Sequence, residues 1–479
     1  MTPLTIIGFF IVSISAIDAK LILRHLGPPP DDIPNRKATL EPVWHTITQR
    51  VDHFNPRDTR TWSMRYISND QFFENDGPIF IYLGGEWTIR TSTLKTGQIF
   101  DMAEQHGGYM FYTEHRYYGE SYPTANMSTE NLRYLSVDQA IADIAYFIHY
   151  VKENIEGLAN SKQLNIDLLP KVVVIGGSYS ASMATWMRLK YPHLVDIAYA
   201  SSAPVRAVAD FYEYFEVVDH NIGLVSQECL DTISEGISQL ESRLETKDGI
   251  NEMSEKLRTC TLIQNKEPFR SFLFNAIAGF FAGLVQYARP TSIRDDCNRL
   301  LGYSGDSLDK LIAYVRAPYN DECIDDYDAF IRQYSAVENT DDSQRSWTYQ
   351  TCTEYGYYQT TTSNHQPFGN TFALDHFVNT CKDLFEKDFG NEILNIGINR
   401  TNTFYGSLTP EITKVVSVHG TVDPWHALGI VEDLNPLAPA ILINGSSHCA
   451  DLHSIKDTDL PQLAAAKRRV QELVAEWLE

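Results

Sequence analysis

The amino-acid sequence predicts an α/β protein: a mostly parallel sheet with helices on both faces, interrupted by a mainly helical insertion. Three observations lead to this prediction. Up to about residue 205, short hydrophobic runs that suit strands alternate with segments whose apolar residues recur at helical spacing. Between about residues 211 and 335, helical spacing prevails. Strand-like runs then return at residues 415–418 and 440–443.

Each element of the predicted core has its own pattern. Residues 79–83 (IFIYL), 109–113 (YMFYT) and 171–175 (KVVVI) are nearly continuous apolar runs, which are typical of strands buried on both faces. Residues 61–67 predict a further strand. Apolar residues at helical spacing predict helices over residues 99–105, 137–155, 182–190 and, at the end of the chain, 461–478.

Composition and charge exclude several classes of protein. Of the 479 residues, 43% are hydrophobic, 12% are aromatic and 21% are charged, so a mainly disordered chain is excluded. The 62 acidic residues outnumber the 39 Lys and Arg residues, which gives a net charge of −23. Such a chain repels phosphate backbones, so we expect no nucleic-acid partner. The sequence leaves the oligomeric state open, with a homodimer as one alternative.

The beginning of the chain has the pattern of an exported protein. Residues 4–17 form an apolar run that is short for a membrane span but suits the core of a signal peptide. Ala16 and Ala19 are small, as cleavage sites require, so we expect residues 1–19 to be a signal peptide rather than a buried first helix. The proline-rich residues 20–42 are expected to form an extended linker.

A second apolar stretch, residues 272–287, also has to be weighed as a membrane span. It is short and contains Asn275 and Gln286. We therefore expect a buried or groove-lining helix and no stable membrane span.

The seven cysteines are unevenly distributed. Six of them lie between residues 229 and 381, and none is paired in a CxxC motif, so neither a zinc site nor thioredoxin chemistry is expected. In an oxidising compartment these six are expected to form disulfides within one subdomain, with the pairing left open. Cys449 is left over. Sequons at Asn126, Asn399 and Asn444 are candidate glycosylation sites.

The strongest local signal for chemistry is the sequence KVVVIGGSYSASMATW. A β-branched strand runs into Ser178, and a helix follows directly, which is the layout of a nucleophile elbow. The strained turn requires small neighbours two residues on either side, and Gly176 and Ser180 occupy these positions. The alternative is a glycine-rich turn without chemistry. We interpret Ser178 as a candidate nucleophile.

A serine nucleophile needs a base and a residue that orients the base, in the chain order Ser, Asp, His. Asp423 follows the strand at residues 415–418 by a short loop, and His448 follows the strand at residues 440–443 in the same way. His426 and His453 compete but do not lie directly after a strand. We expect Asp423 and His448 to complete the catalytic set.

Two backbone N–H groups are expected to bind the oxyanion. One belongs to Tyr179, the residue after the nucleophile, and the other to Gly85 in the loop after residues 79–83. Glu86 follows this loop glycine, and the sequence leaves two roles open for it: binding a charged group of the substrate, or bracing the loop.

Nine short motifs occur in order along the chain: ITQRVDHF, YLGGEW, EHRYYGESYP, NLRYLSVDQA, GGSYSASMATW, YASSAPV, CTEYGYYQT, GTVDPW and SHCADLH. Together they resemble the prolyl-carboxypeptidase and dipeptidyl-peptidase-II family of serine peptidases, in particular its thymus-specific serine protease-like branch. The resemblance runs from about residue 43 to the C-terminus. It implies an α/β-hydrolase core whose triad matches Ser178, Asp423 and His448, and a disulfide-bearing helical cap.

The resemblance also implies a domain plan and an activity. We expect the first part of the core over residues 43–205, the cap over 206–400 and the second part of the core over 401–479. The resemblance implies a lysosomal or secreted exopeptidase that cleaves peptide substrates next to proline. It also implies that the enzyme needs no metal and no organic cofactor. The direction of trimming, from the amino or the carboxyl end, stays open.

The chain departs from the family pattern at Ser180 and Ala181, where glycine is usual, and at Cys449, where a histidine is common. These departures keep an inactive binding protein as an alternative, and an esterase or lipase on the same fold is another. A cap over a deep cleft admits chain ends, which favours an exopeptidase.

Four residues are candidates for binding the substrate. Trp425 lies near the predicted site and, with Tyr179, suits a flat apolar wall for a proline ring, although plain core packing is the alternative. Glu354 and Gln359, in a tyrosine-rich segment, are candidates for binding a substrate terminus, as is Glu86. Glu114, His115 and Arg116 are expected to have structural roles.

Overall fold

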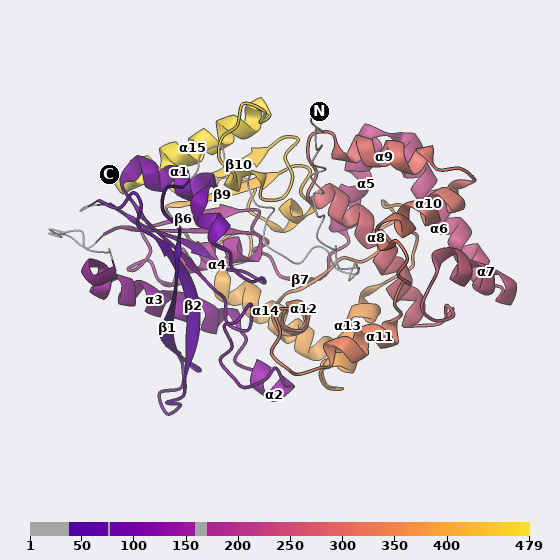
Figure 1. Ribbon diagram of the computed structural model, residues 1–479, viewed down its shortest axis with the longest axis horizontal. Coiled ribbons are helices and arrows are strands. Elements are labelled where there is room, and N and C mark those ends of the chain that lie inside the picture. Colours follow the sequence, from indigo (N-terminus) through magenta and orange to yellow (C-terminus); the bar gives the residue numbers. More distant parts are fainter. Residues whose placement is uncertain (1–37, 75–76, 159–169) are drawn as a thin grey trace, which may run out of the picture.

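The computed structural model describes residues 38–74, 77–158 and 170–479. The predicted signal peptide and most of the predicted linker lie outside the described residues. Figure 1 shows a sheet wrapped by helices, with a largely helical segment gathered beside it.

The central sheet has eight strands in the order β1-β2-β4-β3-β5-β6-β9-β10. β1 pairs antiparallel with β2, and β2 pairs antiparallel with β4, whereas every other neighbouring pair is parallel. The mostly parallel α/β sheet predicted from the sequence is therefore confirmed. The strands are β1 (Val43–Arg50), β2 (Thr61–Asn69), β3 (Ile79–Leu83), β4 (Tyr109–Thr113), β5 (Val172–Gly177), β6 (Ile197–Ser201), β9 (Val415–Gly420) and β10 (Ala440–Ile443).

Alternate residues of each central strand point to opposite faces of the sheet, and both sets are apolar. Helices cover both faces and bury these side chains. Ile79 and Ile81 of β3 belong to the same buried cluster as residues of α3 (Val137–Leu158) and α4 (Tyr179–Lys190). Phe80, between them, belongs to a second cluster with residues of α1 (Gly97–His106) and α15 (Pro461–Leu478). Continuous apolar runs are thus needed in β3, β4 and β5, as the sequence indicates.

Between β6 and β9 the chain forms the helical segment seen on the right of Figure 1. It also contains two short parallel strands, β7 (Val208–Asp210) and β8 (Gly356–Tyr358). Its longer helices are α5 (Glu213–Val225), α6 (Gln227–Leu244), α7 (Lys247–Leu257), α8 (Phe269–Gln286), α9 (Ser292–Gly302), α10 (Ser307–Arg316), α11 (Tyr327–Tyr334), α12 (Gln344–Gln350), α13 (Leu374–Leu384) and α14 (Asn391–Tyr405). The last of these ends beyond residue 400, the predicted boundary of the cap.

The helix α8 contains the second apolar stretch of the sequence. Among the described residues it is the one helix with the length and composition of a membrane span, and 61% of its 18-residue window is buried inside the protein. Its buried residues pack mainly against the rest of the helical segment.

Three disulfides cross-link the helical segment: Cys229–Cys297, Cys260–Cys323 and Cys352–Cys381. The six cysteines expected to form disulfides do so, and the structure supplies the pairing that the sequence left open. Cys449, which lies outside this segment, is a buried free thiol.

The EHRYYG sequence after β4 is held by buried ion pairs. Arg116 is fully buried and binds Asp143 of α3 through Nε and Nη2, at 2.6 and 2.8 Å, and its Nη1 donates to two backbone carbonyls. The Glu114 carboxylate likewise accepts two hydrogen bonds from one guanidinium group, from Nε and Nη2 of Arg65. These contacts favour the structural roles expected for the segment. Burial alone would raise the pKa of Asp143, but Arg116 and then His53 outweigh it and hold this pKa below its usual value.

We predict that Asp143→Asn lowers the free energy of unfolding by about 3–5 kcal/mol, because it leaves the Arg116 charge buried without its partner. Urea unfolding at neutral pH measures the loss. Since the pKa of Asp143 is lowered in the folded state, its contribution is present at neutral pH and is lost as the pH falls, so the difference should shrink below about pH 4. The exposed Asp321, paired with Arg258 at 3.1 Å, provides the control Asp321→Asn, which should leave the midpoint unchanged.

Candidate active site

Ser178 stands at a sharp turn between β5 and α4. Its φ of 60° and ψ of −133° lie outside the regions that a serine usually adopts. Backbone hydrogen bonds fix the turn on both sides: Ser178 N donates to Ser201 O of β6, and Ala181 N donates to Ser178 O, both at 2.9 Å. A Cβ atom on Gly176 would lie 2.2 Å from the carbonyl oxygen of Ser180, so only glycine fits there.

Ser180 occupies the position where the family pattern has glycine. Its hydroxyl donates to the Gly177 carbonyl at 2.9 Å and accepts from the Gly177 N–H at 3.0 Å. The side chain is fully buried. The Ser180 hydroxyl, which a glycine would lack, therefore closes the turn with hydrogen bonds to Gly177, the residue before Ser178. Ala181 packs in the buried core.

Asp423 and His448 meet in a buried pair. Asp423 follows β9 and begins the short 3₁₀ helix η5 (Pro424–Leu428), where its Oδ1 accepts from Trp425 N at 3.0 Å. Its Oδ2 lies 2.9 Å from Nδ1 of His448, and both residues are at most 3% exposed. Burial alone would lower the pKa of His448, but the Asp423 carboxylate raises it well above its usual value.

The two competing histidines have other positions. His426 Nδ1 lies 2.6 Å from the backbone oxygen of Asp423, not from its carboxylate. His453 ends the short 3₁₀ helix η6 (Ala450–Leu452). Of these three histidines, His448 is the one that the structure brings to the Asp423 carboxylate.

Ser178 and His448 are not hydrogen-bonded in this structure. His448 Nε2 is buried and has no hydrogen-bond partner among the described residues. Ser178 lines one cavity, whereas His448 lines a neighbouring hollow with Tyr287, Arg289 and Lys456. Hydrogen bonds of this kind are often long or misaligned without substrate and tighten when it binds.

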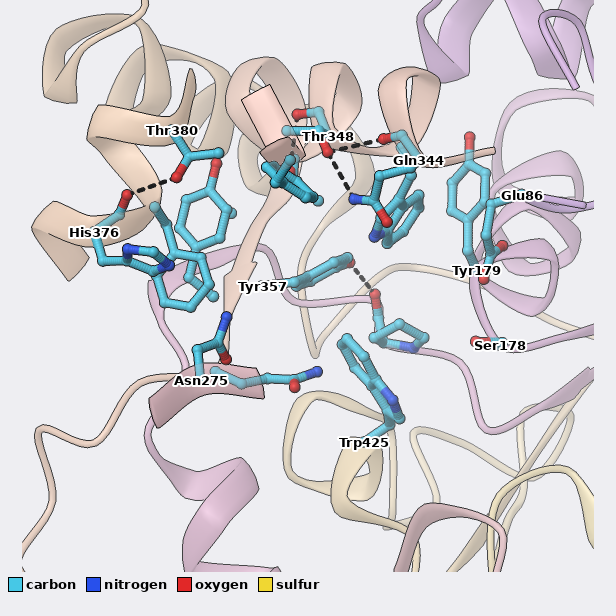
Figure 2. A pocket seen from close by; sticks show the side chains of 18 of the residues that line it. Glu86, Ser178, Tyr179, Asn275, Gln344, Thr348, Tyr357, His376, Thr380 and Trp425 are labelled. Atoms are coloured by element: carbon cyan, nitrogen blue, oxygen red, sulfur yellow. Dashed lines mark hydrogen bonds between the residues drawn. The ribbon is translucent and has the colours of Figure 1, made fainter. Parts of the chain in front are cut away.

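The cavity at Ser178 lies between the sheet core and the helical segment (Figure 2). It encloses about 1020 Å³, its open mouth included. Ser178, Tyr179 and Glu86 stand at one end in Figure 2, and Asn275, His376 and Thr380 stand at the other. Trp425 and Gln359 also line it, so four of the residues predicted to bind substrate or oxyanion share one cavity with Ser178: Tyr179, Glu86, Gln359 and Trp425.

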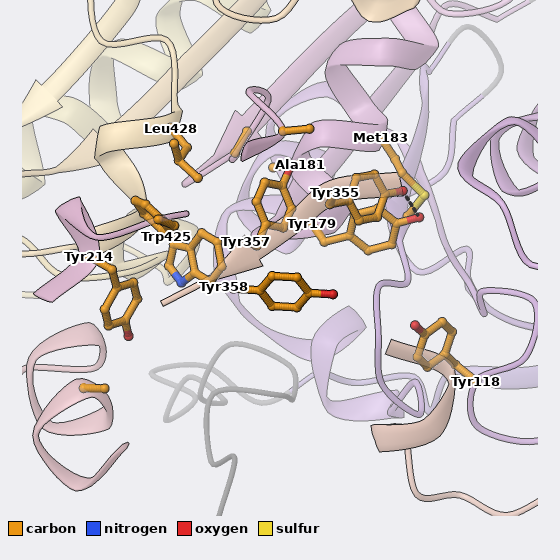
Figure 3. Close-up of a cluster of buried hydrophobic side chains, with 14 of the residues drawn as sticks. Tyr118, Tyr179, Ala181, Met183, Tyr214, Tyr355, Tyr357, Tyr358, Trp425 and Leu428 are labelled. Carbon is orange, nitrogen blue, oxygen red and sulfur yellow. Dashed lines mark hydrogen bonds between the residues drawn. The ribbon is translucent and has the colours of Figure 1, made fainter. Parts of the chain in front are cut away.

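Three aromatic residues, Tyr179, Tyr357 and Trp425, line one wall of this cavity, and the fully buried Tyr355 joins them in a row of rings (Figure 3). Ring centroids are 5.5 Å apart between Tyr179 and Tyr355, 5.3 Å between Tyr355 and Tyr357, and 5.5 Å between Tyr357 and Trp425. Tyr355 and Tyr357 were not singled out from the sequence, although both lie in its tyrosine-rich segment. Tyr355 and Tyr357 are stacked at an interplanar angle of 14°, whereas Tyr179 is tilted by 51° from Tyr355 and Trp425 stands edge to face with Tyr357 at 83°. The wall beside the Ser178 turn is therefore aromatic and angled.

Hydrogen bonds behind this wall join the helical segment to the elbow. The Tyr179 hydroxyl contacts His115 Nε2 at 3.1 Å, Gln350 Nε2 at 3.0 Å and the Tyr355 hydroxyl at 3.3 Å. Burial lowers the pKa of His115 to about 4, so this ring is neutral at neutral pH. The side chain after Ser178 is therefore held from both parts of the molecule.

Glu354 belongs to this buried layer and is not among the residues that line the cavity. Its two carboxylate oxygens accept from Val137 N at 3.0 and 3.2 Å, and Gln350 Nε2 also donates to one of them. The structure thus places Glu354 behind the wall, whereas Gln359 reaches the cavity.

The loop after β3 places Gly85 and Glu86 near Ser178. The Gly84 N–H is bonded to Thr113 O at 2.9 Å, which favours Gly85 as the donor to a ligand. A Cβ on Gly85 would lie 2.6 Å from the Trp87 ring, so glycine is required there. Glu86 is 3% exposed, and its Oε2 has no hydrogen-bond partner among the described residues. Burial raises the pKa of Glu86 to about 8.

One residue of α8 touches both loops of the Asp423–His448 pair and was not singled out for this role. The buried Gln286 accepts from Trp425 Nε1 at 3.0 Å and from the Tyr214 hydroxyl at 2.7 Å through its side-chain oxygen. Its backbone oxygen accepts from His448 N at 2.9 Å. A polar residue inside an apolar helix was the only sequence signal for it.

The three sequon asparagines lie away from the cavity lining. Asn399 and Asn444 are exposed, whereas Asn126 is half-buried and accepts hydrogen bonds from Ser128 N and Asn131 Nδ2. Glycosylation at these positions stays a prediction.

The folded sheet, the elbow and the buried Asp–His pair define an α/β hydrolase. The family model described as serine carboxypeptidase S28 matches residues 49–470, and the chain belongs to this family of serine peptidases. The family resemblance inferred from the nine motifs is therefore confirmed.

Relatives in several animals share most of the chain. A putative serine protease of Caenorhabditis elegans, K12H4.7, is 33% identical over 91% of this chain and 88% of its own. The thymus-specific serine protease of Homo sapiens is 32% identical over 90% and 86%. The lysosomal Pro-X carboxypeptidase of Homo sapiens is 25% identical over 95% and 91%.

We predict that Ser180→Ala lowers the free energy of unfolding by about 1–2 kcal/mol, because it leaves the buried Gly177 N–H without its acceptor. Chemical unfolding followed by tryptophan fluorescence measures the change. Ser182→Ala is the matched control, since the Ser182 hydroxyl is buried in the same helix but has no hydrogen-bond partner among the described residues. Equal losses in the two variants would contradict a special role for the Ser180 hydrogen bonds.

Proposed function

We propose that the protein is a serine exopeptidase in which Ser178, His448 and Asp423 form the catalytic triad. The observation that carries this proposal is the buried Asp423–His448 hydrogen bond on loops that follow two strands of the sheet that also presents the strained Ser178 turn. Membership of the serine carboxypeptidase S28 family supports the same chemistry.

In the proposed reaction the hydroxyl oxygen of Ser178 attacks the scissile carbonyl carbon, while His448 Nε2 takes the proton of that hydroxyl group. The resulting imidazolium returns the proton to the leaving amine, the C–N bond breaks, and an ester to Ser178 remains. In the second half of the reaction, His448 takes a proton from water while the water oxygen forms a bond to the acyl carbon. The ester C–O bond then breaks, the acid is released, and the imidazolium returns the proton to the Ser178 oxygen. Asp423 fixes the Nδ1–H tautomer and stabilises the charged ring.

The developing oxyanion is assigned to the backbone N–H groups of Tyr179 and Gly85. Tyr179 is the first residue of α4, so its amide lies at the positive end of the helix dipole. The Gly85 amide comes from the loop after β3, the strand that pairs with β5.

An exopeptidase that acts next to proline agrees best with the cavity. The helical segment encloses it, which excludes the interior of a folded chain, and the rings of Tyr357 and Trp425, which meet edge to face, offer an apolar corner for a pyrrolidine ring. The name of one relative, lysosomal Pro-X carboxypeptidase, points to the same preference. Gln359 and Glu86 are the proposed polar contacts to substrate.

We place the protein in the secretory pathway, lysosomal or secreted. Three disulfides fit an oxidising compartment, and three of the relatives are named as lysosomal enzymes.

We predict that a fluorophosphonate probe labels the purified, disulfide-intact protein and that Ser178→Ala abolishes the labelling. A defined peptide mixture, read by mass spectrometry, should lose single residues or short fragments next to proline. Thr185→Ala, a change in α4 away from the turn, is the control and should keep the labelling. Absence of labelling in folded wild-type protein would contradict the proposal.

Asp423→Asn should lower turnover by roughly 10⁴-fold, because the amide stabilises the wrong imidazole tautomer. Since the carboxylate raises the pKa of His448, its removal should also move the acidic limb of the pH–rate profile of the residual activity to lower pH. The full pH profile of kcat/KM measures both effects. A loss of only a few-fold would remove Asp423 from the triad.

A further inference from the structure

Glu86 is a buried acid that lacks a full set of hydrogen-bond partners among the described residues. It is 3% exposed, it lines the cavity beside Ser178 and Tyr179, and its Oε2 has no hydrogen-bond partner among the described residues. A buried carboxyl oxygen without a partner costs free energy in the empty protein. A ligand group that binds this oxygen would recover that cost.

The charges around the cavity indicate the sign of this ligand group. None of the described residues that line the cavity is Lys or Arg. His376 lines its far end, and burial lowers the pKa of this histidine to about 4, so the ring is neutral at neutral pH. A substrate carboxylate would find no fixed cation there, whereas an ammonium group would find an acid.

The groups that face Glu86 from the surrounding elements add no fixed positive charge. They are His448 and the hydroxyl groups of Tyr118, Tyr179 and Tyr287. Of these, only His448 carries a positive charge, when it is protonated. The carboxyl group therefore has no permanent cationic partner of its own.

The two proposed catalytic side chains face different spaces. Ser178, which would carry the acyl fragment, lines the cavity with Glu86. His448, which would protonate the leaving amine, lines a second hollow together with Arg289, Lys456 and Asp459. In this arrangement the cavity holds the amino-terminal side of the substrate, and the second hollow, with two cationic side chains against one carboxylate, suits the carboxyl-terminal side.

We propose that the carboxyl group of Glu86 binds the free amino terminus of the peptide, so that the enzyme removes short fragments from the amino-terminal end. This inference rests on the proposed peptidase function and fixes the direction of trimming that the sequence leaves open. Glu86 is then a specificity-determining residue, which contacts the substrate beside the reacting carbonyl.

The proton balance of this contact is measurable. Because burial raises the pKa of Glu86 to about 8, the carboxyl group of the free enzyme holds a proton at pH 6. A peptide amino terminus, with an ordinary pKa near 8, is an ammonium at the same pH. Formation of the ion pair therefore releases about one proton for each peptide bound.

The kinetic test uses one peptide, Ala-Pro-Ala-Phe, with its amino end free or acetylated and its carboxyl end free or amidated. In the wild-type enzyme, acetylation should lower kcat/KM at least about 30-fold, because it removes one partner of a buried charge pair, and amidation should have little effect. In Glu86→Gln the effect of acetylation should nearly vanish, and Glu86→Asp should retain part of it. Glu354→Gln changes a buried acid behind the cavity wall and should leave the effect unchanged.

Three kinetic outcomes would overturn the inference: a wild-type enzyme indifferent to acetylation, one that instead requires the free carboxylate, or a Glu86→Gln variant that keeps the full preference. Labelling of each variant by the fluorophosphonate probe shows that its site is folded. Failure of the proposed function is recognised separately, since wild-type protein would then neither label nor cleave any of the four peptides.

The binding test does not depend on turnover. Ser178→Ala is titrated with the free peptide at pH 6 in two buffers that differ in ionisation enthalpy. Release of about one proton per peptide, abolished in Ser178→Ala/Glu86→Gln, supports the ion pair. Release of no proton, or no binding of the free peptide, overturns it.

Discussion

The positive φ of Ser178 is the constraint on which the rest of the site depends. The turn can form because β5 is paired on both sides and α4 begins at the next residue. The hydrogen bonds of these two elements stabilise the strained backbone conformation of Ser178. It needs Gly176, which no larger residue can replace, and it gains two hydrogen bonds from Ser180. Glu86, Asp423 and His448 lie on loops that emerge at this edge of the sheet, and the helical segment supplies the rest of the cavity lining.

The parallel strands explain why these loops meet. β3, β5, β6, β9 and β10 run in one direction, so the loops that follow them lie at a common edge. Glu86 follows β3, Ser178 follows β5, and Asp423 and His448 follow β9 and β10. Residues far apart in the sequence are thereby brought to one region by the order of the strands.

Much of the core was predictable because β3, β4 and β5 are buried on both faces and consist of apolar residues throughout. β1 was missed because it is an edge strand, and five of the eight residues in its sequence, VWHTITQR, are exposed. β7 and β8 have three residues each, which is too short for a periodic signal.

The candidate site was predictable where a residue of the proposed triad lies in the turn or short loop after a strand, as do Ser178, Asp423 and His448. It was not predictable where the side-chain direction depends on packing between distant segments. Glu354 has the same residue type as Glu86 and was a candidate for the same role, yet it lies in a π-helical turn that directs it at the start of α3. The disulfide pairing, the row of aromatic rings from Tyr179 to Trp425 and the contacts of Gln286 likewise arise only from the folded arrangement.

Gln286 has a mechanical consequence. It belongs to the helical segment, yet it is bonded to Trp425 in one loop of the Asp423–His448 pair and to the backbone of His448 in the other. A hinged opening of this segment would pull on the loops that hold Asp423 and His448, the proposed catalytic pair. These hydrogen bonds therefore couple any movement of the helical segment to the position of that pair.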